Sequence, residues 1–181
     1  CKRYRNNGGG NTVNVKGQAY EINGIYGWSN GNRDQGIYSV NVSVSGGEVK
    51  LDGGTVIREQ VPPNGYKGGN INGNFAYSAD KKASATNGTV SINNGIVGNG
   101  TPTGYGINGS FALSDRDSTV ADGGKVTISG NSEVNFSDWP NNTFRGIIGS
   151  QAFTNEWGDS KADAKAINGS VTISGSNIGG N

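Results

Sequence analysis

The sequence contains no histidine and no methionine. Without histidine the chain cannot build a Ser-His-Asp or Cys-His catalytic unit or an imidazole metal site, so the most common general base and the most common metal ligand are both missing. The missing initiator methionine predicts that the chain is a processed or excised piece of a longer protein. These absences exclude the catalytic and metal-binding classes that depend on imidazole.

Cysteine occurs once, at Cys1, so an internal disulfide is excluded. Two explanations for a cysteine at this position remain open: a fragment boundary, which the basic residues after it favour, or the lipid anchor of a bacterial lipoprotein. The chain also lacks a run of 18 or more apolar residues and a signal-like hydrophobic segment. We therefore expect no membrane insertion by this segment.

The sequence also has no marked excess of positive or negative residues. Lysine and arginine number 15 and aspartate and glutamate 14, which leaves a formal net charge of +1. A protein that binds nucleic acid or an anionic membrane needs a basic surface. We therefore expect no nucleic-acid partner.

Leucine is rare, with two residues against 14 valines and 14 isoleucines. Helices favour leucine over β-branched residues, whose side chains lose rotamer freedom against the preceding turn. Only 31% of the residues are apolar, and glycine, asparagine, serine and threonine make up nearly half of the chain. This composition predicts an all-β protein with a long, thin core shared among repeated units.

Two short templates recur along the chain. In the first, isoleucine, glycine, an aromatic and a bulky residue occupy alternate positions, and its copies begin at Ile22, Ile71, Ile107 and Ile147. Gln151 replaces the aromatic residue in the last copy. In the second, valine or isoleucine alternates with serine, threonine or asparagine, and its copies begin at Val42, Val90, Val126 and Val171, with an earlier copy at Val13. The intervals between copies vary, so insertions fall between strands.

Both templates have a period of two residues, which is typical of half-buried β-strands. If equivalent residues of successive repeats stack, Tyr26, Phe75 and Phe111 form an inner aromatic ladder. The repeated glycine of the first template is predicted to leave space beside this ladder. The small residue at position six and the hydroxyl residue at position eight are predicted to face outward.

Ten Asn-Gly pairs indicate frequent tight turns, because asparagine and glycine adopt the positive φ values that such turns need. Short strands, frequent corners and recurring motifs predict an all-β fold, namely a right-handed parallel β-helix with irregular loops. An antiparallel β-sandwich is the alternative, although it does not explain the repeats. Residues 1–181 are interpreted as one β-solenoid segment, with repeats that start near residues 22, 71, 107 and 147. Roughly 20 residues per coil predict a rod of roughly 40 Å.

The repeated unit resembles a known family of surface proteins. It reads Ile-x-Gly-x-aromatic-Ala-x-Ser, then a polar loop, then Gly-x-Val-Thr-Ile-Ser-Gly, and it covers Ile22 to Gly175. This unit resembles the degenerate repeats in passenger regions of bacterial autotransporters and related haemagglutinin-like surface adhesins. The resemblance implies an extended β-helical stalk that is exported to the bacterial cell surface and mediates adhesion or self-association. The family has no universal binding residues to transfer to this chain.

Asp115, Asp117 and Asp122 crowd one loop, and carboxylates at this spacing can ligate Ca²⁺. The equivalent loop after Ser78 carries lysines, so we interpret both as solvated loops. Arg116 beside these carboxylates is the best cluster for a polysaccharide lyase or hydrolase, but no second acidic cluster completes it. We expect no catalytic, cofactor-binding or metal-binding residues.

Aromatic residues outside both templates are the candidates for partner contact. Long loops on a rigid solenoid are where partner contacts concentrate, and loop aromatics can stack on sugars or anchor a protein. The partner-binding candidates are Tyr66, Tyr105, Trp139 and Trp157.

The function expected from the sequence is that of a noncatalytic segment of a secreted bacterial surface adhesin. Its partner would be a host or bacterial surface protein or glycan, or a second copy of itself. A β-helical carbohydrate-active enzyme is one alternative, which requires clustered carboxylates on one outer face. A repeat-surface ice binder is the other, which requires a flat threonine array, whereas the outward positions mix Ser43, Ser91, Thr127 and Thr172.

Overall fold

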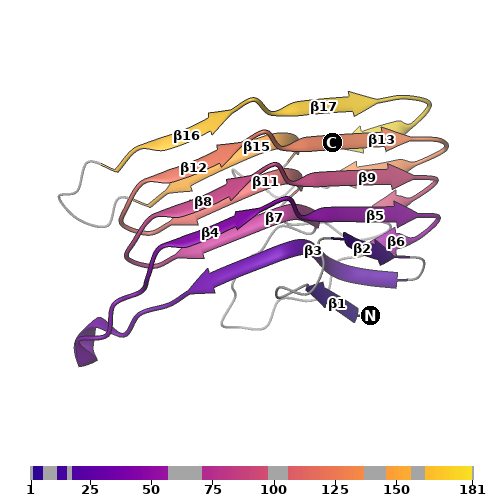
Figure 1. Ribbon diagram of the computed structural model, residues 1–181. Helices are drawn as coiled ribbons and strands as arrows, with labels where there is room; N and C mark the ends of the chain where they lie inside the picture. Colours follow the sequence, from indigo (N-terminus) through magenta and orange to yellow (C-terminus); the bar gives the residue numbers. More distant parts are fainter. Residues whose placement is uncertain are drawn as a thin grey trace.

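The computed structural model of the chain describes residues 2–5, 12–15, 18–56, 71–97, 106–136, 146–155 and 162–180. Within these ranges the chain forms short β-strands and one 3-10 turn, η1 (Arg33–Gln35). The strands stack in columns, with each repeat laid over the one before it (Figure 1). All pairings between the named strands are parallel. The antiparallel sandwich alternative is therefore wrong.

Four columns of strands continue from repeat to repeat. The first column holds β3 (Gln18–Ser29), β7 (Ile71–Ser78), β11 (Ile107–Ser114) and β15 (Ile147–Thr154). The second holds β4 (Val42–Ser45), β8 (Ala83–Thr86), β12 (Thr119–Asp122) and β16 (Ala164–Ile167). The third holds β2 (Thr12–Val15), β5 (Glu48–Asp52), β9 (Thr89–Asn93), β13 (Lys125–Ser129) and β17 (Ser170–Ile173). The fourth holds β6 (Thr55–Val56), β10 (Ile96–Val97), β14 (Glu133–Phe136) and β18 (Asn177–Gly180).

The long strand β3 joins the first and fourth columns into one sheet. Its first residues pair with β6, its later residues pair with β7, and β1 (Lys2–Arg5) pairs along its other edge. The second and third columns form separate sheets. The protein is thus all-β, with three stacked parallel sheets.

Each repeat contributes one strand to each column, and we call these four strands a level. Neighbouring strands lie ~4.8 Å apart, so the five strands of the third column span only ~19 Å. This is about half of the roughly 40 Å predicted from roughly 20 residues per coil. The prediction is wrong because a whole repeat, with its loops, makes a single level.

The register stacks like residues in the first and third columns. In the first column, four isoleucines lie one above another: Ile22, Ile71, Ile107 and Ile147. In the third, a column of valines does the same: Val13, Val49, Val90, Val126 and Val171. The prediction that Val42 stacks with Val90, Val126 and Val171 is wrong, because Val42 pairs with Ala83 in the second column. The strands β4 and β5 both alternate valine with polar residues, so the pattern alone does not distinguish them.

Two apolar cores lie inside the stack. The larger is formed by columns one, three and four and contains Ile22, Val49, Leu51, Ile71, Val90, Ile92, Val97, Ile107, Val126, Ile128 and Val134. The smaller lies between columns one and two and contains Val44, Ala76, Ala83, Ala85, Ala112 and Ala121. Position six of the first template therefore faces inward, contrary to the prediction. It is alanine there because small side chains let two strands pack closely.

The aromatic ladder of Tyr26, Phe75 and Phe111 is present. The rings of Tyr26 and Phe75 are stacked, with centroids 5.2 Å apart, and Phe75 meets Phe111 edge-on at 5.3 Å. Side chains alternate along a strand, so these rings lie on the opposite face from the alanines. They form a third cluster with Trp28 and Tyr77. The ladder therefore lies outside the two cores.

The repeated glycine of the first template is needed for a close backbone approach. A Cβ added at Gly73 would lie 2.6 Å from Gly109 O and 2.7 Å from Gly88 C. The corner between columns two and three thus touches the strand at this glycine. Ser110, which follows the equivalent glycine Gly109 of the next repeat, fastens that corner by accepting a hydrogen bond from Gly88 N over 2.9 Å. The glycine makes room for this corner and not for the aromatic ladder.

Seven of the ten Asn-Gly pairs lie in the described ranges. The pair at Asn30 follows β3 and has no positive φ, and the other six form two groups. Asn87, Asn94 and Asn168 have positive φ values of 55°, 52° and 51° and turn corners, as predicted. Three other pairs lie inside first-column strands, where the turn prediction is wrong: those beginning at Asn23, Asn72 and Asn108. The pairs that begin at Asn7, Asn64 and Asn99 fall outside the ranges that the structure describes.

The asparagines inside the strands form a buried amide ladder. Asn72 Nδ2 donates to Asn23 Oδ1 over 2.8 Å, and Asn108 Nδ2 donates to Asn72 Oδ1 over 3.0 Å. The next register position is Ile148, whose side chain has no hydrogen-bond donor. Asn108 Oδ1 is consequently left buried without a hydrogen bond.

Candidate functional site

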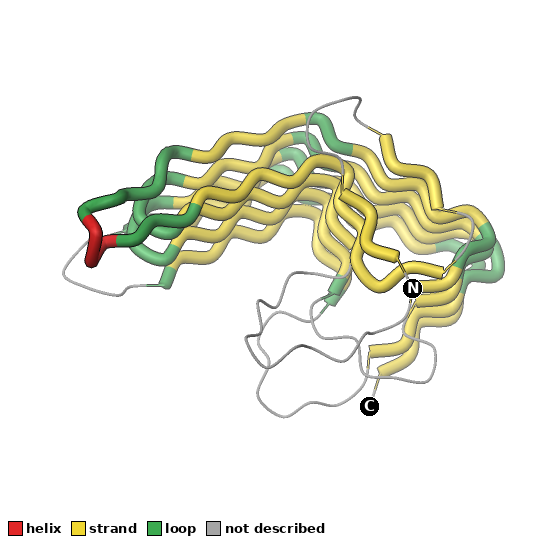
Figure 2. Tube along the Cα trace, turned by 90° about the horizontal axis from the view of Figure 1, so that it is seen from below, coloured by secondary structure: helices red, strands yellow, loops and turns green. Residues whose placement is uncertain are grey.

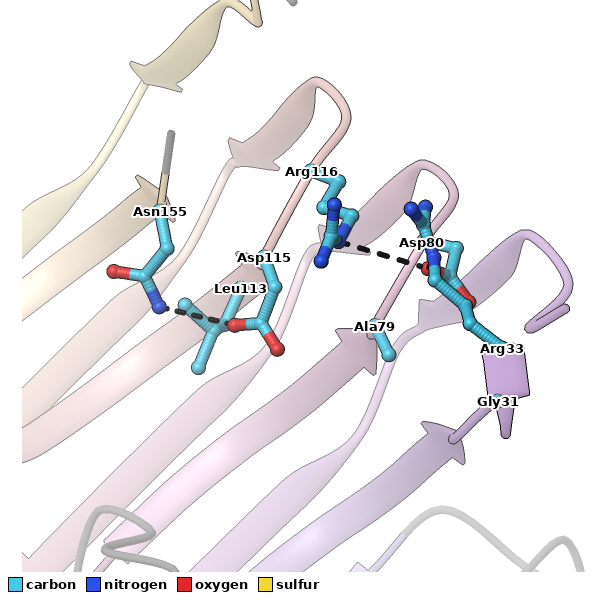
Figure 3. A pocket seen from close by; sticks show the side chains of 8 residues that line it. All are labelled: Gly31, Arg33, Ala79, Asp80, Leu113, Asp115, Arg116 and Asn155. Atoms are coloured by element: carbon cyan, nitrogen blue, oxygen red, sulfur yellow. Dashed lines mark hydrogen bonds and ion pairs between the residues drawn. The ribbon is translucent and has the colours of Figure 1, made fainter. Parts of the chain in front are cut away.

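A groove of about 410 Å³ lies where the first column ends and the chain turns toward the second column (Figure 3). In repeats two and three a short turn follows the first-column strand, and these turns lie with η1 along one edge of the stack (Figure 2). Stacking thereby brings distant parts of the sequence to one surface. The lining residues come from all four repeats: Gly31, Arg33, Ala79, Asp80, Leu113, Asp115, Arg116 and Asn155.

A hydroxyl residue ends each first-column strand, and in repeats two and three it holds the turn that follows. Ser78 Oγ donates to Val40 O over 2.9 Å and accepts from Lys81 N over 3.1 Å. Ser114 Oγ donates to Lys81 O over 2.8 Å and accepts from Asp117 N over 3.1 Å. Both serines are buried, so the prediction that position eight faces outward is wrong. Each hydroxyl fastens its own turn to the turn of the preceding repeat.

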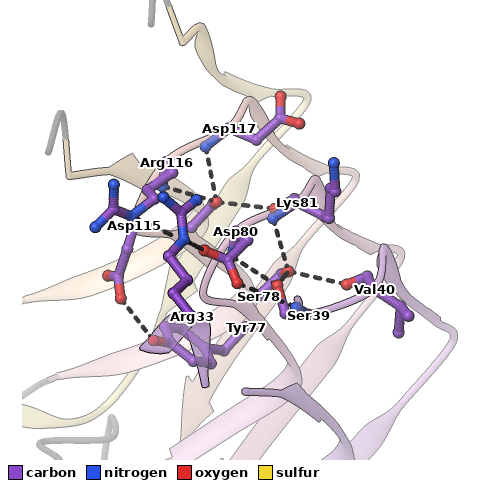
Figure 4. A network of polar contacts seen from close by, with 11 residues as sticks. Arg33, Ser39, Val40, Tyr77, Ser78, Asp80, Lys81, Asp115, Arg116 and Asp117 are labelled. Atoms are coloured by element: carbon purple, nitrogen blue, oxygen red, sulfur yellow. Dashed lines mark hydrogen bonds and ion pairs between the residues drawn. The ribbon is translucent and has the colours of Figure 1, made fainter. Parts of the chain in front are cut away.

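Asp80 is the buried carboxylate of the groove, with 4% of its side chain exposed. Its Oδ2 accepts from Ser39 N over 3.0 Å, and its Oδ1 pairs with Arg33 Nε and lies 3.9 Å from Arg116 Nε (Figure 4). Burial alone would raise the pKa of Asp80, but the Ser39 N–H and the Arg33 guanidinium favour the charged form more strongly. The pKa of Asp80 therefore lies below its usual value, and the ionised carboxylate anchors the arginines.

Asp115 is held by residues of the repeats on either side of its own. Its Oδ2 accepts from the Tyr77 hydroxyl over 2.6 Å, and its Oδ1 accepts from Asn155 Nδ2 over 3.0 Å. An ionised carboxylate has about four lone-pair sites. Asp115 therefore keeps acceptor capacity toward the groove while its orientation is set by two hydrogen bonds.

The three aspartates considered as a Ca²⁺ site do not converge. Asp115 lies in the groove, whereas Asp117 Oδ1 accepts from Ser118 N over 2.6 Å. Asp122 Oδ1 accepts from Asn168 Nδ2 over 2.9 Å, at the far end of β12. Over the part of the chain that the structure describes, no group of three or more His, Cys, Asp or Glu residues has a geometry that could hold a metal ion.

The partner-contact candidates Tyr66, Tyr105, Trp139 and Trp157 lie outside the described residues. Sequence reasoning found Asp115 and Arg116 but did not single out the other charged residues of the groove. A usable signal was present for Asn155, because the residue directly after the hydroxyl of the first template is polar in three repeats, Asn30, Asp115 and Asn155, but this pattern gives no signal for Arg33 or Asp80. Aligning these turns across the repeats would have placed the three polar residues on one surface.

A comparison of the chain with protein-family models, curated proteins and solved structures finds no match. Among the residues described here, no helix has the length and apolar character needed to cross a membrane.

Proposed function

We propose that the chain is a noncatalytic segment of a secreted bacterial surface adhesin, an autotransporter-like passenger stalk built as a right-handed parallel β-helix. The observation that carries this proposal is the register, which stacks like residues from level to level in the first and third columns. Each level is hydrogen-bonded to the next and shares its core with it, which makes such a stack stiff along its axis. A stalk that presents a binding surface needs this stiffness.

The last described level supports an extended stack. Val171 and Ile173 are 42% and 44% exposed, whereas their register partners Val126 and Ile128 are 1% and 0% exposed. The core residue types of β13 and β17 are the same at these two positions, so β17 is built like an interior strand and not like part of a polar cap. It offers a stacking surface to a further level of β-structure.

The groove favours binding over catalysis. A glycosidase needs a carboxyl group whose raised pKa lets it act as a general acid. The contacts of Asp80 with Ser39 and Arg33 lower its pKa instead. The paired arginines and carboxylates form a hydrogen-bonding surface suited to a host or bacterial glycan or protein.

The ice-binding alternative is disfavoured by the outward row of the third column. This row is formed by Lys50, Ser91, Thr127 and Thr172. Ser43, expected in this row, lies in the second column instead. A lysine and a serine interrupt the threonines, so this face lacks the regular array that the alternative requires.

Adhesion by the purified chain tests the proposal. Beads coated with the folded chain are expected to bind epithelial cells or bacteria more strongly than beads coated with albumin or with the heat-unfolded chain. The same preparation is expected to release no reducing sugar from polysaccharides. Binding no stronger than that of albumin beads, or release of sugar, would contradict the proposal.

A further inference from the structure

The groove offers a ligand donors and acceptors that are already held in place. A guanidinium group carries five N–H donors in a rigid plane, and Asp80 anchors Arg33 through Nε. Arg116 lies beside the same carboxylate, and both arginine side chains are partly exposed. Asp115 supplies acceptor lone pairs while Tyr77 and Asn155 fix its orientation. A bound group therefore meets a preorganised polar surface, which lowers the entropic cost of binding.

The formal charges of the lining balance. The two positive charges of Arg33 and Arg116 are balanced by the negative charges of Asp80 and Asp115. An anionic ligand would be repelled by the two carboxylates, and a cationic ligand would be repelled by the two guanidinium groups. A hydroxyl group is both a donor and an acceptor. A neutral polyol can thus pair with the arginines and with Asp115 at the same time, as Figure 3 lets the reader follow.

The groove also has apolar surface. Leu113 and Ala79 line it. A sugar ring presents C–H groups on its faces and hydroxyls around its edge, so it combines apolar packing with hydrogen bonds. The volume lies near the lower end of the range for small-ligand pockets, roughly 300–1,000 Å³. This size suits a sugar unit.

We propose that the groove binds a neutral hexose unit of a surface glycan. The hexose hydroxyls accept hydrogen bonds from Arg33 and Arg116 and donate hydrogen bonds to Asp115. The ring packs against Leu113. This inference rests on the proposed adhesin function and names the ligand class of that adhesin.

Titration calorimetry with the full chain tests the inference, using maltohexaose, cellohexaose and mannohexaose as neutral probes and hexagalacturonate as the acidic probe. Asp115→Asn and Arg116→Gln change the groove. Asp117→Asn and Lys82→Gln are the matched controls, because both residues lie in equivalent turns but do not line the groove. Circular dichroism melting of each variant shows whether it is folded.

Binding of at least one neutral probe, weakened about tenfold or more by Asp115→Asn and by Arg116→Gln and unchanged in both controls, is the expected result, since each variant loses a charge-assisted hydrogen bond. Three results would overturn the inference. No neutral probe binds, or only hexagalacturonate binds with an affinity that falls as salt rises, or the groove variants bind a neutral probe as tightly as the wild type.

The bead assay separates this inference from the adhesin proposal. If beads coated with the Asp115→Asn chain adhere as well as wild-type beads, the groove is not the adhesive site and the inference fails, while the adhesin proposal stands. If the neutral probes bind in the groove and are cleaved, the noncatalytic function fails instead, while the groove remains a sugar site.

Discussion

Ile128 and Ile173 occupy the same register position in adjacent levels of the third column but differ in burial. Ile128 is fully buried in the larger core, whereas Ile173 is 44% exposed on the open last level. Replacing each residue by alanine removes the same atoms from two environments. The difference in stability loss between Ile128→Ala and Ile173→Ala therefore measures how much burial under a further level contributes to the free energy of unfolding.

The expected losses of unfolding free energy follow from the area and cavity terms. Isoleucine to alanine removes about three methylene-sized groups, or about 2.4 kcal/mol of transfer free energy when the side chain is buried. A residual cavity adds to this, so Ile128→Ala is expected to cost about 3–4 kcal/mol. At Ile173 the transfer term falls to about 1.3 kcal/mol because the side chain is partly exposed, and a site open to water leaves no closed cavity.

Thermal unfolding followed by far-ultraviolet circular dichroism checks this difference. In a chain of this size, 1 kcal/mol shifts Tm by roughly 2–4 °C, so the expected shifts are roughly 6–16 °C for Ile128→Ala and roughly 3–5 °C for Ile173→Ala. Equal shifts for both variants at low protein concentration would refute the assignment of Ile128 to a closed level and Ile173 to an open one. A Tm shift of Ile173→Ala that grows with concentration would show that another molecule covers the open level.

Three further substitutions test the other structural assignments. Gly88→Ala is expected to cost about 3 kcal/mol, because its Cβ would overlap Gly109 O in the adjacent level. Asn72→Ala is expected to cost about 3 kcal/mol, because it leaves buried amide groups of the ladder without partners. The folded-state pKa of Asp80 is lowered, so its ionised form stabilises the protein above roughly pH 4 and this stabilisation is lost as pH falls further. In melting curves between neutral pH and pH 2, Asp80→Asn is expected to lose less Tm on acidification than the wild type.

Two of these substitutions have a matched control variant. Gly36 has a φ of 70° with no atom near the added Cβ, so Gly36→Ala is expected to cost only about 1 kcal/mol of backbone strain, and a loss as large as that of Gly88→Ala would contradict the close approach. Ile148→Asn offers a donor to Asn108 Oδ1 and is expected to raise stability by about 1 kcal/mol, so a lower Tm would count against the ladder. Parallel pH profiles of the wild type and Asp80→Asn would refute the ion pair as a source of stability.

The features that the sequence alone determined are local ones. Alternation of β-branched and polar residues predicts strands because side chains on a strand alternate with a period of two. The members of the aromatic ladder followed from the recurring first template, and the corners at Asn87, Asn94 and Asn168 followed from the conformational preferences of asparagine. Each of these depends on a few neighbouring residues.

Other features were decided only by the tertiary structure, because they depend on which strands lie next to each other. Alternation does not tell β4 from β5, so only the parallel pairing shows that Val49, and not Val42, lies beside Val90. The two faces of a first-column strand are both covered, so position six is buried where a half-exposed strand was expected. Arg33 and Asp80 meet because stacking superposes turns that are 47 residues apart in the chain. A local pattern specifies which side chains share a face, whereas the neighbouring strand and the length of the intervening loop specify what that face contacts.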